Sequence, residues 1–171
     1  MDYKLIKAAE AFAMGAHCGM GQFRKYSGEP YIVHPIRVAT LVGQIQGSST
    51  DMIRAALLHD VVEDTEVTID NIQDLFGARV SNFVEYLTKR RKEEWPTYTR
   101  WQMKEMEARR LAVAPYEVQT IKYADFIDNG PSLIENEPDF AKTWVAEKNM
   151  MLEGMTRGNT ELRNRAIAIG V

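Results

Sequence analysis

The stretch AALLHDVVEDT, residues 55–65, places four titratable side chains in an otherwise apolar run: His59, Asp60, Glu63 and Asp64. Burying an unpaired carboxylate is costly, so three acids in a buried segment require positive charge nearby. A divalent cation is the largest local charge that could supply it, and imidazole beside carboxylates suits transition metals. These residue types therefore indicate a metal site, although a His-Asp step taken alone is more often a helix end or a surface pair.

Three further stretches carry residues of the same kind. YIVHP places His34 next to a proline that fits a helix start. IKYADFIDN spaces Lys122, Asp125 and Asn129 three and four residues apart, on one face of a helix. A lone histidine is more often a core residue, and Asp125 could simply pair with Lys122. FRKYSG supplies two adjacent cations in a glycine-flanked loop, which are either solvated or able to bind phosphate.

Apolar side chains recur every three to four residues along most of the chain, which predicts helices. The expected helices cover residues 3–17, 35–46, 48–65, 68–77, 78–94, 97–113, 116–129, 138–157 and 159–169. Gly130-Pro131 should end or kink the seventh of them. No strand-type alternation is long enough to rely on. We therefore expect an all-α protein with a single domain, residues 1–171.

The third expected helix, residues 48–65, would stack the acidic residues in pairs. Residues four apart share a helix face, so His59 should lie above Glu63 and Asp60 above Asp64.

The bulk composition restricts the partners and the compartment. The 171 residues are 45% hydrophobic and 26% charged, as in ordinary globular proteins, and the net charge of -3 argues against a nucleic-acid partner. The one cysteine, Cys18, excludes an internal disulfide and fits a reducing compartment. Neither a membrane-spanning run nor a signal peptide is evident. We expect a cytoplasmic protein without a membrane partner; its oligomeric state is left open.

The order H…HD…D, made by His34, His59-Asp60 and Asp125, resembles the signature of the HD superfamily of metal-dependent phosphohydrolases. RKYSGEPYIVHPIRVA, AALLHDVVEDTEVT, FGARV and IKYAD..DN resemble the hydrolase domains of the RelA/SpoT family, which cleave the 3′-diphosphate of the alarmones ppGpp and pppGpp. LEGMTRGNTELRNRA resembles the end of the small stand-alone hydrolases of this group, of the metazoan SpoT homologue type. The resemblance covers about residues 8–165 and implies an HD-type helical bundle.

The resemblance also implies a role for each site residue. The metal ligands would be His34, His59, Asp60 and Asp125, holding one ion per chain, usually manganese (Mn²⁺). Glu63 and Asp64 would orient and deprotonate the attacking water. The residues expected to bind the nucleotide substrate are Arg24, Lys25, Ser27, Lys122, Asn129 and Ser132. The expected reaction converts (p)ppGpp to GDP or GTP and pyrophosphate, and the chain is too short to carry a synthetase domain as well.

Two alternatives stay open, because both would keep the same fold. One is an HD-type nucleotide phosphatase that acts on NADPH or a deoxynucleotide, and the other is an inactive nucleotide-binding module. Two departures from the family pattern concern the pocket. His17 and Gln22 are five residues apart instead of three, so the loop is longer. Phe126 replaces a basic residue and Asp128 a His or Tyr, which should alter substrate preference.

Overall fold

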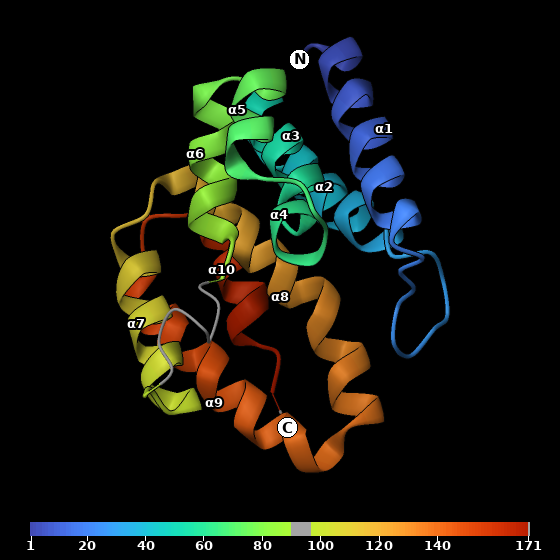
Figure 1. Cartoon of the computed structure of the whole chain (residues 1–171). Helices are drawn as coiled ribbons and strands as arrows, with labels where there is room; N and C mark the ends of the chain where they lie inside the picture. Colours follow the sequence, from blue (N-terminus) through green and yellow to red (C-terminus); the bar gives the residue numbers. More distant parts are fainter. Residues whose placement is uncertain (90–96, 171) are drawn as a thin grey trace. The chain divides into compact units, whose positions relative to one another are not determined.

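The computed structural model describes residues 1–89 and 97–170, and every regular element in these ranges is a helix (Figure 1). The helices are α1 (Tyr3–Gly19), α2 (Val33–Gln44), α3 (Thr50–Leu58), α4 (Val61–Asp64), α5 (Ile69–Phe76), α6 (Ala78–Leu87), α7 (Arg100–Ala112), α8 (Tyr116–Asn136), α9 (Pro138–Gly154) and α10 (Thr160–Ile167). The predicted all-α class is confirmed. None of the helices in these ranges is long and apolar enough to cross a membrane.

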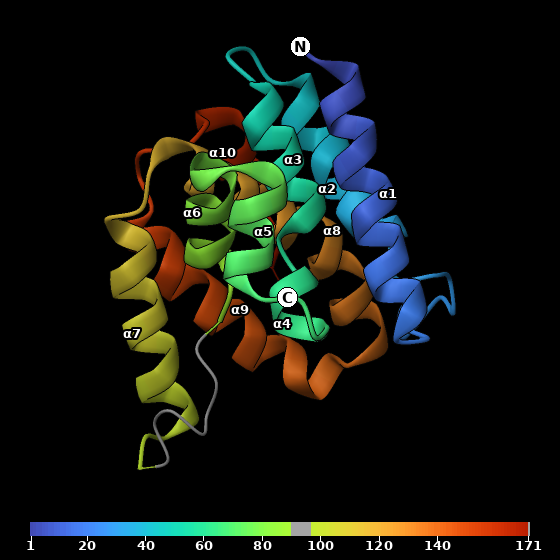
Figure 2. The same cartoon turned by 45° about the horizontal axis from the view of Figure 1, so that its top comes forward.

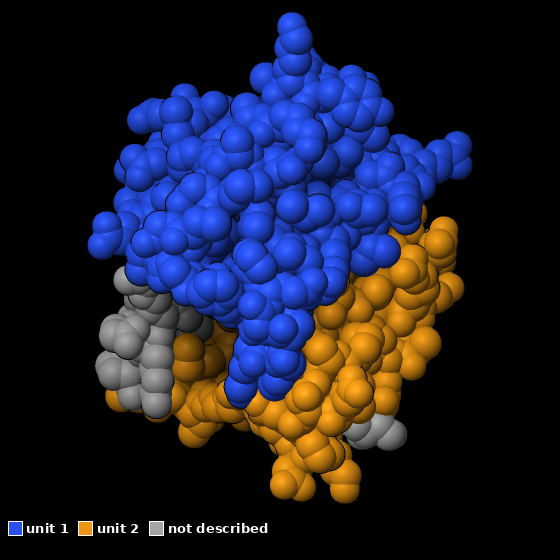
Figure 3. Space-filling view, turned by 90° about the vertical axis from the view of Figure 1, so that its right-hand side faces the viewer, with its two compact units in different colours: residues 1–88 blue, residues 89–171 orange. Residues whose placement is uncertain are grey.

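The chain divides into two compact units, Met1–Thr88 and Lys89–Val171, which Figure 3 colours separately. The first unit holds α1 to α6 and the second holds α7 to α10. The single domain expected over residues 1–171 stays a prediction.

In the first unit, α3 is the central helix, since it packs against α1, α2 and α6 (Figures 1 and 2). Where α1 meets α3, alanines supply part of the buried surface, and such small side chains let helix backbones approach closely. Ala9 and Ala13 of α1, and Ala55 and Ala56 of α3, are fully buried. α5 and α6 form a helical hairpin, joined at Gly77 with a φ of +87°.

Side-chain caps fix where several helices begin. Ser49 Oγ accepts the Met52 amide N–H at 3.2 Å and starts α3. Thr68 and Asn71 form a reciprocal capping box at the start of α5. These bonds satisfy amides that have no partner inside the helix.

The predicted continuous helix over residues 48–65 is wrong, because α3 ends at Leu58 and α4 begins at Val61. His59 Nδ1 lies 2.8 Å from Ala56 O, so the imidazole satisfies a carbonyl of the last turn of α3. The second helix also differs from its prediction. It begins at Val33 instead of Pro35, since a proline without an N–H is tolerated anywhere in a first turn.

In the second unit, α9 packs along α7 and also contacts α8, while α10 packs mainly on α8 (Figure 1). The buried side chain of Gln119 ties these helices together. Its Nε2 donates to Leu111 O at 2.9 Å, and its Oε1 accepts the amides of Arg157 and Gly158 at 2.8 and 3.2 Å. One amide therefore connects the end of α7 with the segment before α10.

α8 does not end at Gly130-Pro131 but continues to Asn136. A Cβ at position 130 would lie 2.7 Å from Ile169 Cγ2 and 3.1 Å from Trp144 Cη2, so glycine permits close packing here. Tertiary packing of this kind outweighs the weak helix propensity of glycine and proline. Of the helix predicted for residues 78–94, α6 ends at Leu87 and residues 90–94 lie outside the described ranges.

Candidate functional site

His59 and Asp60 follow the last residue of α3 and form the centre of a polar cluster in the first unit. Because His59 Nδ1 lies against a backbone carbonyl, the neutral form of this ring keeps its proton on Nδ1 and has its lone pair on Nε2; the tautomer is assigned from the hydrogen bond. Metal-binding histidines commonly use such a carbonyl to fix their tautomer. His59 Nε2 lies 3.1 Å from Asp60 Oδ2. The ring is thus prepared to bind a cation through Nε2.

Asp60 Oδ2 is the point where the cluster converges. The Tyr31 hydroxyl donates to it at 2.6 Å, and His34 Nε2 lies 3.5 Å away. Burial by itself would raise the pKa of Asp60, but His59 and His34 in their protonated form outweigh burial through their charge and hydrogen bonds and hold that pKa well below its ordinary value. Two imidazole nitrogens around one carboxylate oxygen are a mixed donor set that fits a divalent transition metal.

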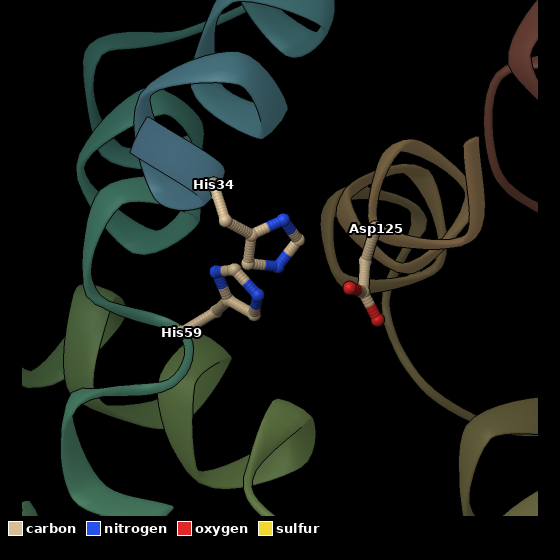
Figure 4. Close-up of side chains that lie close together, drawn as sticks. All are labelled: His34, His59 and Asp125. Atoms are coloured by element: carbon tan, nitrogen blue, oxygen red, sulfur yellow. The ribbon is translucent and has the colours of Figure 1, made fainter. Parts of the chain in front are cut away.

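His34 lies in the first turn of α2, where its side chain is fully buried. Its ring centroid is 5.1 Å from that of His59, at an interplanar angle of 68°, and 5.9 Å from that of Tyr31. Figure 4 shows the two imidazoles side by side, carried by separate segments of the first unit. Aromatic packing therefore fixes both rings next to the carboxylate of Asp60.

Asp125 lies on α8 in the second unit, and both of its oxygens accept hydrogen bonds. Lys122 Nζ donates to Oδ2 at 2.8 Å, and Asn129 Nδ2 donates to Oδ1 at 2.6 Å. The helical spacing in IKYADFIDN predicts this shared face. His34, His59 and Asp125 are a group of side chains that could hold a metal ion (Figure 4).

Glu63 and Asp64 lie on α4, which is a single turn long. Both side chains are half-buried. Their predicted stacking above His59 and Asp60 assumed one unbroken helix, which the structure does not have. They nevertheless follow the cluster within four residues, because α4 begins immediately after Asp60.

The basic residues lie in a loop, residues 22–31, that is closed at its base. Tyr31 N donates to Gln22 O at 3.1 Å, and Phe23 and Pro30 form an isolated antiparallel bridge above this bond. Gly28, with a φ of +69°, makes the turn at the tip. Arg24 N donates to Glu29 O at 2.8 Å across the loop. The hydrogen bonds thus give this loop a defined hairpin-like shape.

The predicted substrate residues of the loop differ in their surroundings. Lys25 is exposed, with its Nζ 5.3 Å from the centroid of the Tyr26 ring, whereas Arg24 is half-buried. Ser27 Oγ donates to Glu29 Oε2 at 2.9 Å. The serine hydroxyl therefore supports the loop itself in this conformation.

The other predicted substrate residues belong to α8. Ser132 Oγ donates to the Asn129 carbonyl at 3.2 Å. Phe126 does not stand where a basic residue would meet solvent, because it is buried against Trp144 with ring centroids 6.1 Å apart. Asp128 is half-buried. Of the two departures from the family pattern on this helix, Asp128 is therefore the one that adds charge near the surface.

Three side chains support the cluster in ways that residue types did not predict: Tyr31, which was missed altogether, and His17 and Gln22, which were considered only for their spacing. His17 Nδ1 lies 2.6 Å from Gln22 Oε1, and Gln22 Nε2 donates to Asp64 O at 3.1 Å. Tyr31 donates to Asp60. The tyrosine lies in YIVHP itself, three residues before His34, and this closeness to a predicted ligand could have indicated its role.

Curated relatives of this chain carry names that describe alarmone metabolism. A probable guanosine-3′,5′-bis(diphosphate) 3′-pyrophosphohydrolase of Synechocystis is 39% identical over 136 residues, which is 79% of this chain and 17% of the relative. The bifunctional (p)ppGpp synthase/hydrolase SpoT of Escherichia coli is 36% identical over 137 residues, 80% of this chain and 19% of the relative. The chain thus spans less than a fifth of the length of these relatives.

Two solved structures match the fold over most of the chain. A metazoan orthologue of SpoT that hydrolyses ppGpp superposes with a TM-score of 0.82 at 24% identity, covering 96% of this chain and 93% of that one. A structure from Listeria monocytogenes superposes with a TM-score of 0.65 at 25% identity, covering 84% of this chain and 96% of that one. A sequence model described as an HD domain matches residues 9–150, a range that includes His34, His59, Asp60 and Asp125. The chain therefore belongs to the HD domain family, whose domains depend on a metal ion.

Proposed function

We propose that this chain is a manganese-dependent hydrolase that removes the 3′-diphosphate of (p)ppGpp, releasing GDP or GTP and pyrophosphate. The observation that carries the proposal is the convergence of His34 Nε2 and His59 Nε2 on Asp60 Oδ2. Relatives named as 3′-pyrophosphohydrolases of guanosine bis(diphosphate) support the choice of substrate, at 39% identity over 136 residues for the Synechocystis protein.

One Mn²⁺ would be held by His34, His59, Asp60 and Asp125. Their imidazole and carboxylate donors fit it, and the neutral form of His59 has the tautomer whose lone pair is on Nε2. When bound, the ion supplies positive charge to the phosphoryl oxygens and makes water more acidic. Lys122 and Asn129 would keep the carboxylate of Asp125 oriented, since each donates to one of its oxygens.

The remaining steps fall to the side chains of the protein. Glu63 and Asp64 would orient the attacking water and accept its proton. The water oxygen forms a bond to the phosphorus next to the ribose 3′ oxygen, and the bond between that phosphorus and the 3′ oxygen breaks. Pyrophosphate then carries the water oxygen, and the proton passes to the 3′ oxygen. Arg24 and Lys25 would neutralise the diphosphate.

Four further side chains are proposed as contacts to the nucleotide: Ser27, Lys122, Asn129 and Ser132. For Ser27, contact with substrate would require its hydroxyl to exchange the bond to Glu29 for one to the nucleotide. We propose that the two units serve this reaction as one domain, since the match to the HD domain runs from residue 9 to residue 150. A free nucleotide, with no nucleic acid or membrane partner, is the proposed substrate, and the cytoplasm the proposed compartment.

Asp128 favours a second candidate, a phosphatase acting on NADPH or a deoxynucleotide. The family has a His or Tyr at this position, and a half-buried carboxylate would repel (p)ppGpp more than NADPH or a deoxynucleotide, since the alarmone carries more phosphate groups. Both candidates use the same metal ligands, so only the products distinguish them.

The test is a nucleotide panel with purified protein and Mn²⁺, scored separately for pyrophosphate and orthophosphate. Turnover of ppGpp and pppGpp to pyrophosphate is expected. Orthophosphate from NADPH or a deoxynucleotide, with ppGpp intact, would establish the second candidate instead. Asp60→Ala should abolish both metal binding and turnover, and unchanged activity would refute the metal mechanism.

The division of roles within the site is tested by Glu63→Ala. This variant should retain its metal and lose most of its turnover. Loss of bound metal would show that Glu63 is a ligand and would contradict its assignment as a proton acceptor.

A further inference from the structure

The sequence HCGMGQ ends α1 with a well-defined helix cap. Gln22 N donates to His17 O at 3.2 Å, Gly21 N donates to Cys18 O at 3.0 Å, and Gly21 has a φ of +63°. These two bonds and a left-handed glycine are a Schellman motif, with Gly21 as the residue that reverses the chain. The reversal brings residues 17 and 22 together. The longer spacing between His17 and Gln22 therefore does not separate them.

The two side chains occupy the positions where this motif usually has an apolar contact. Here they form a directed polar chain. The Asp64 carbonyl can only accept, so the Gln22 group that faces it at 3.1 Å must be the amide NH₂. Gln22 Oε1 then faces His17 Nδ1 at 2.6 Å, so His17 must donate from Nδ1. The amide of Gln22 consequently has one orientation only.

His17 is as buried as a core residue, at 1% exposure. Its Nε2 has no hydrogen-bond partner among the residues that the structure describes. Burying an unpaired ring nitrogen costs stability. The ring packs beside Tyr31, with centroids 4.8 Å apart, and its hydrogen bond goes to Gln22, so the ring is held in place and holds the amide in turn.

The bond to Asp64 lies at the end of an element that is not stable by itself. α4 contains one helical turn, with Asp64 N donating to Asp60 O at 3.0 Å and Thr65 N to Val61 O at 3.1 Å. So short a helix depends on tertiary contacts, and its last carbonyls need external partners. α1 supplies such a contact. Gln22 satisfies the carbonyl of Asp64, the second of the two proposed proton acceptors.

The beginning of α4 is not capped by its own side chain. Asp60 occupies the N-cap position, but its carboxylate is directed at Tyr31 and the two histidines. Tyr31 and Gln22 are joined at the base of the basic loop by the bond from Tyr31 N to Gln22 O. The base of this loop thus contacts both ends of the helical turn that carries Glu63 and Asp64.

We propose that Gln22, fixed by His17, is a positioning residue that holds Glu63 and Asp64 in register with the metal ligands. This inference rests on the proposed function in one respect, namely the assignment of Glu63 and Asp64 as proton acceptors. A displacement of about 1 Å in a catalytic group can reduce the rate about 100-fold. Loss of the Gln22 contact should therefore slow the chemical step more than it weakens binding.

The test compares two variants of the full chain that remove different bonds. In Gln22→Glu the carboxylate can still accept from His17 but cannot donate to the Asp64 carbonyl. In Gln22→Met both bonds are lost. The matched control is Gln73→Glu, the same change at an exposed position of α5 in the same unit.

Both variants are expected to lower kcat about 10- to 100-fold, while KM and the Kd for Mn²⁺ stay within about threefold of the unmodified chain. Amide hydrogen exchange in a peptide covering residues 60–66 should accelerate in both variants and not in the control. Unchanged exchange in that peptide, or a loss of kcat matched by an equal loss of Mn²⁺ affinity, would overturn the inference.

Failure of the proposed substrate would be recognised separately. The exchange measurement needs no substrate, and kcat can be followed with whichever nucleotide the unmodified chain hydrolyses. Lack of ppGpp turnover together with accelerated exchange in the variants would remove the alarmone and retain the positioning role of Gln22.

Discussion

Lys122→Met should show how strongly the carboxylate of Asp125 depends on a nearby positive charge. Lys122 Nζ lies 2.8 Å from Asp125 Oδ2, and the two side chains are only 8% and 10% exposed. Burial by itself would lower the pKa of Lys122, but Asp125 and Glu107 outweigh burial and raise that pKa above its ordinary value of 10.5. Lys122 is therefore charged in any assay near neutral pH, and the stability contributed by its charge is lost as the pH rises through this elevated pKa.

The expected cost follows from burial. Removing one partner of a buried ion pair typically costs about 3–5 kcal/mol. For a chain of this size, each kcal/mol lowers Tm by roughly 2–4 °C, so Tm should fall by about 6–20 °C. Lys7→Met is the matched control, since Lys7 and Glu10 have the same i,i+3 spacing at 2.7 Å but side chains that are 73% and 23% exposed. That pair should contribute less than about 1 kcal/mol.

The assay is thermal unfolding of both variants, with chelator and with saturating Mn²⁺. A metal at 100 times its Kd stabilises a protein by about 2.7 kcal/mol. Mn²⁺ should raise Tm more in Lys122→Met than in the unmodified chain, because the ion would replace the lost ammonium beside Asp125. Equal Tm losses in the two lysine variants would refute the reasoning from burial. An equal Mn²⁺ response in Lys122→Met and the unmodified chain would refute Asp125 as a ligand.

Three further outcomes are expected. Glu107→Gln should lose about 1–3 kcal/mol of unfolding free energy at pH 7. Burial by itself would raise the pKa of Glu107, but its lysine neighbours outweigh burial and hold that pKa below the ordinary 4.5. In urea denaturation, the difference in unfolding free energy between the variant and the unmodified chain should therefore shrink as the pH falls below 4.5. Gly158→Ala should cost at least about 1–3 kcal/mol, because the added Cβ would lie 2.5 Å from Tyr123 Cε2. Gly15→Ala is the control and should be neutral or stabilising, since a Cβ there would have nothing within 4 Å. Equal Tm values for the two variants would contradict the argument from close packing. Chelation should lower Tm in the unmodified chain and not in His59→Ala, as calorimetry would show.

Much of the fold follows from local chemistry that the sequence displays. Ser49 and Thr68 cap α3 and α5, and a cap of this kind involves only residues within about four positions of each other, so it is visible in the local sequence. The break after Leu58 could not be found in this way. It depends on the Tyr31 hydroxyl, which reaches Asp60 from 29 positions earlier, as well as on the local bond between His59 and Ala56 O.

The continuation of α8 through Gly130-Pro131 has a similar explanation. Local propensity predicts an interruption, but Trp144 and Ile169 pack against the bare backbone of Gly130. Such a contact depends on the folded chain and not on nearby sequence.

For the candidate site, the residue types indicated metal chemistry and the family resemblance suggested the complete ligand set. The membership in the HD domain family is confirmed. What the sequence did not reveal is the support for these residues. The pairing of His17 with Gln22 requires the left-handed Gly21, and a spacing counted in residues does not show that the chain doubles back.

The cap at the end of α1 also makes the protein accessible to spectroscopy. Cys18 is the one cysteine in the sequence, and its side chain is exposed in the turn that joins His17 to Gln22. A thiol-specific fluorophore or spin label would therefore attach at a single position, without prior removal of other cysteines. Because Gln22 reaches the Asp64 carbonyl directly, such a probe would report on the anchoring of α4 while nucleotide and metal are titrated.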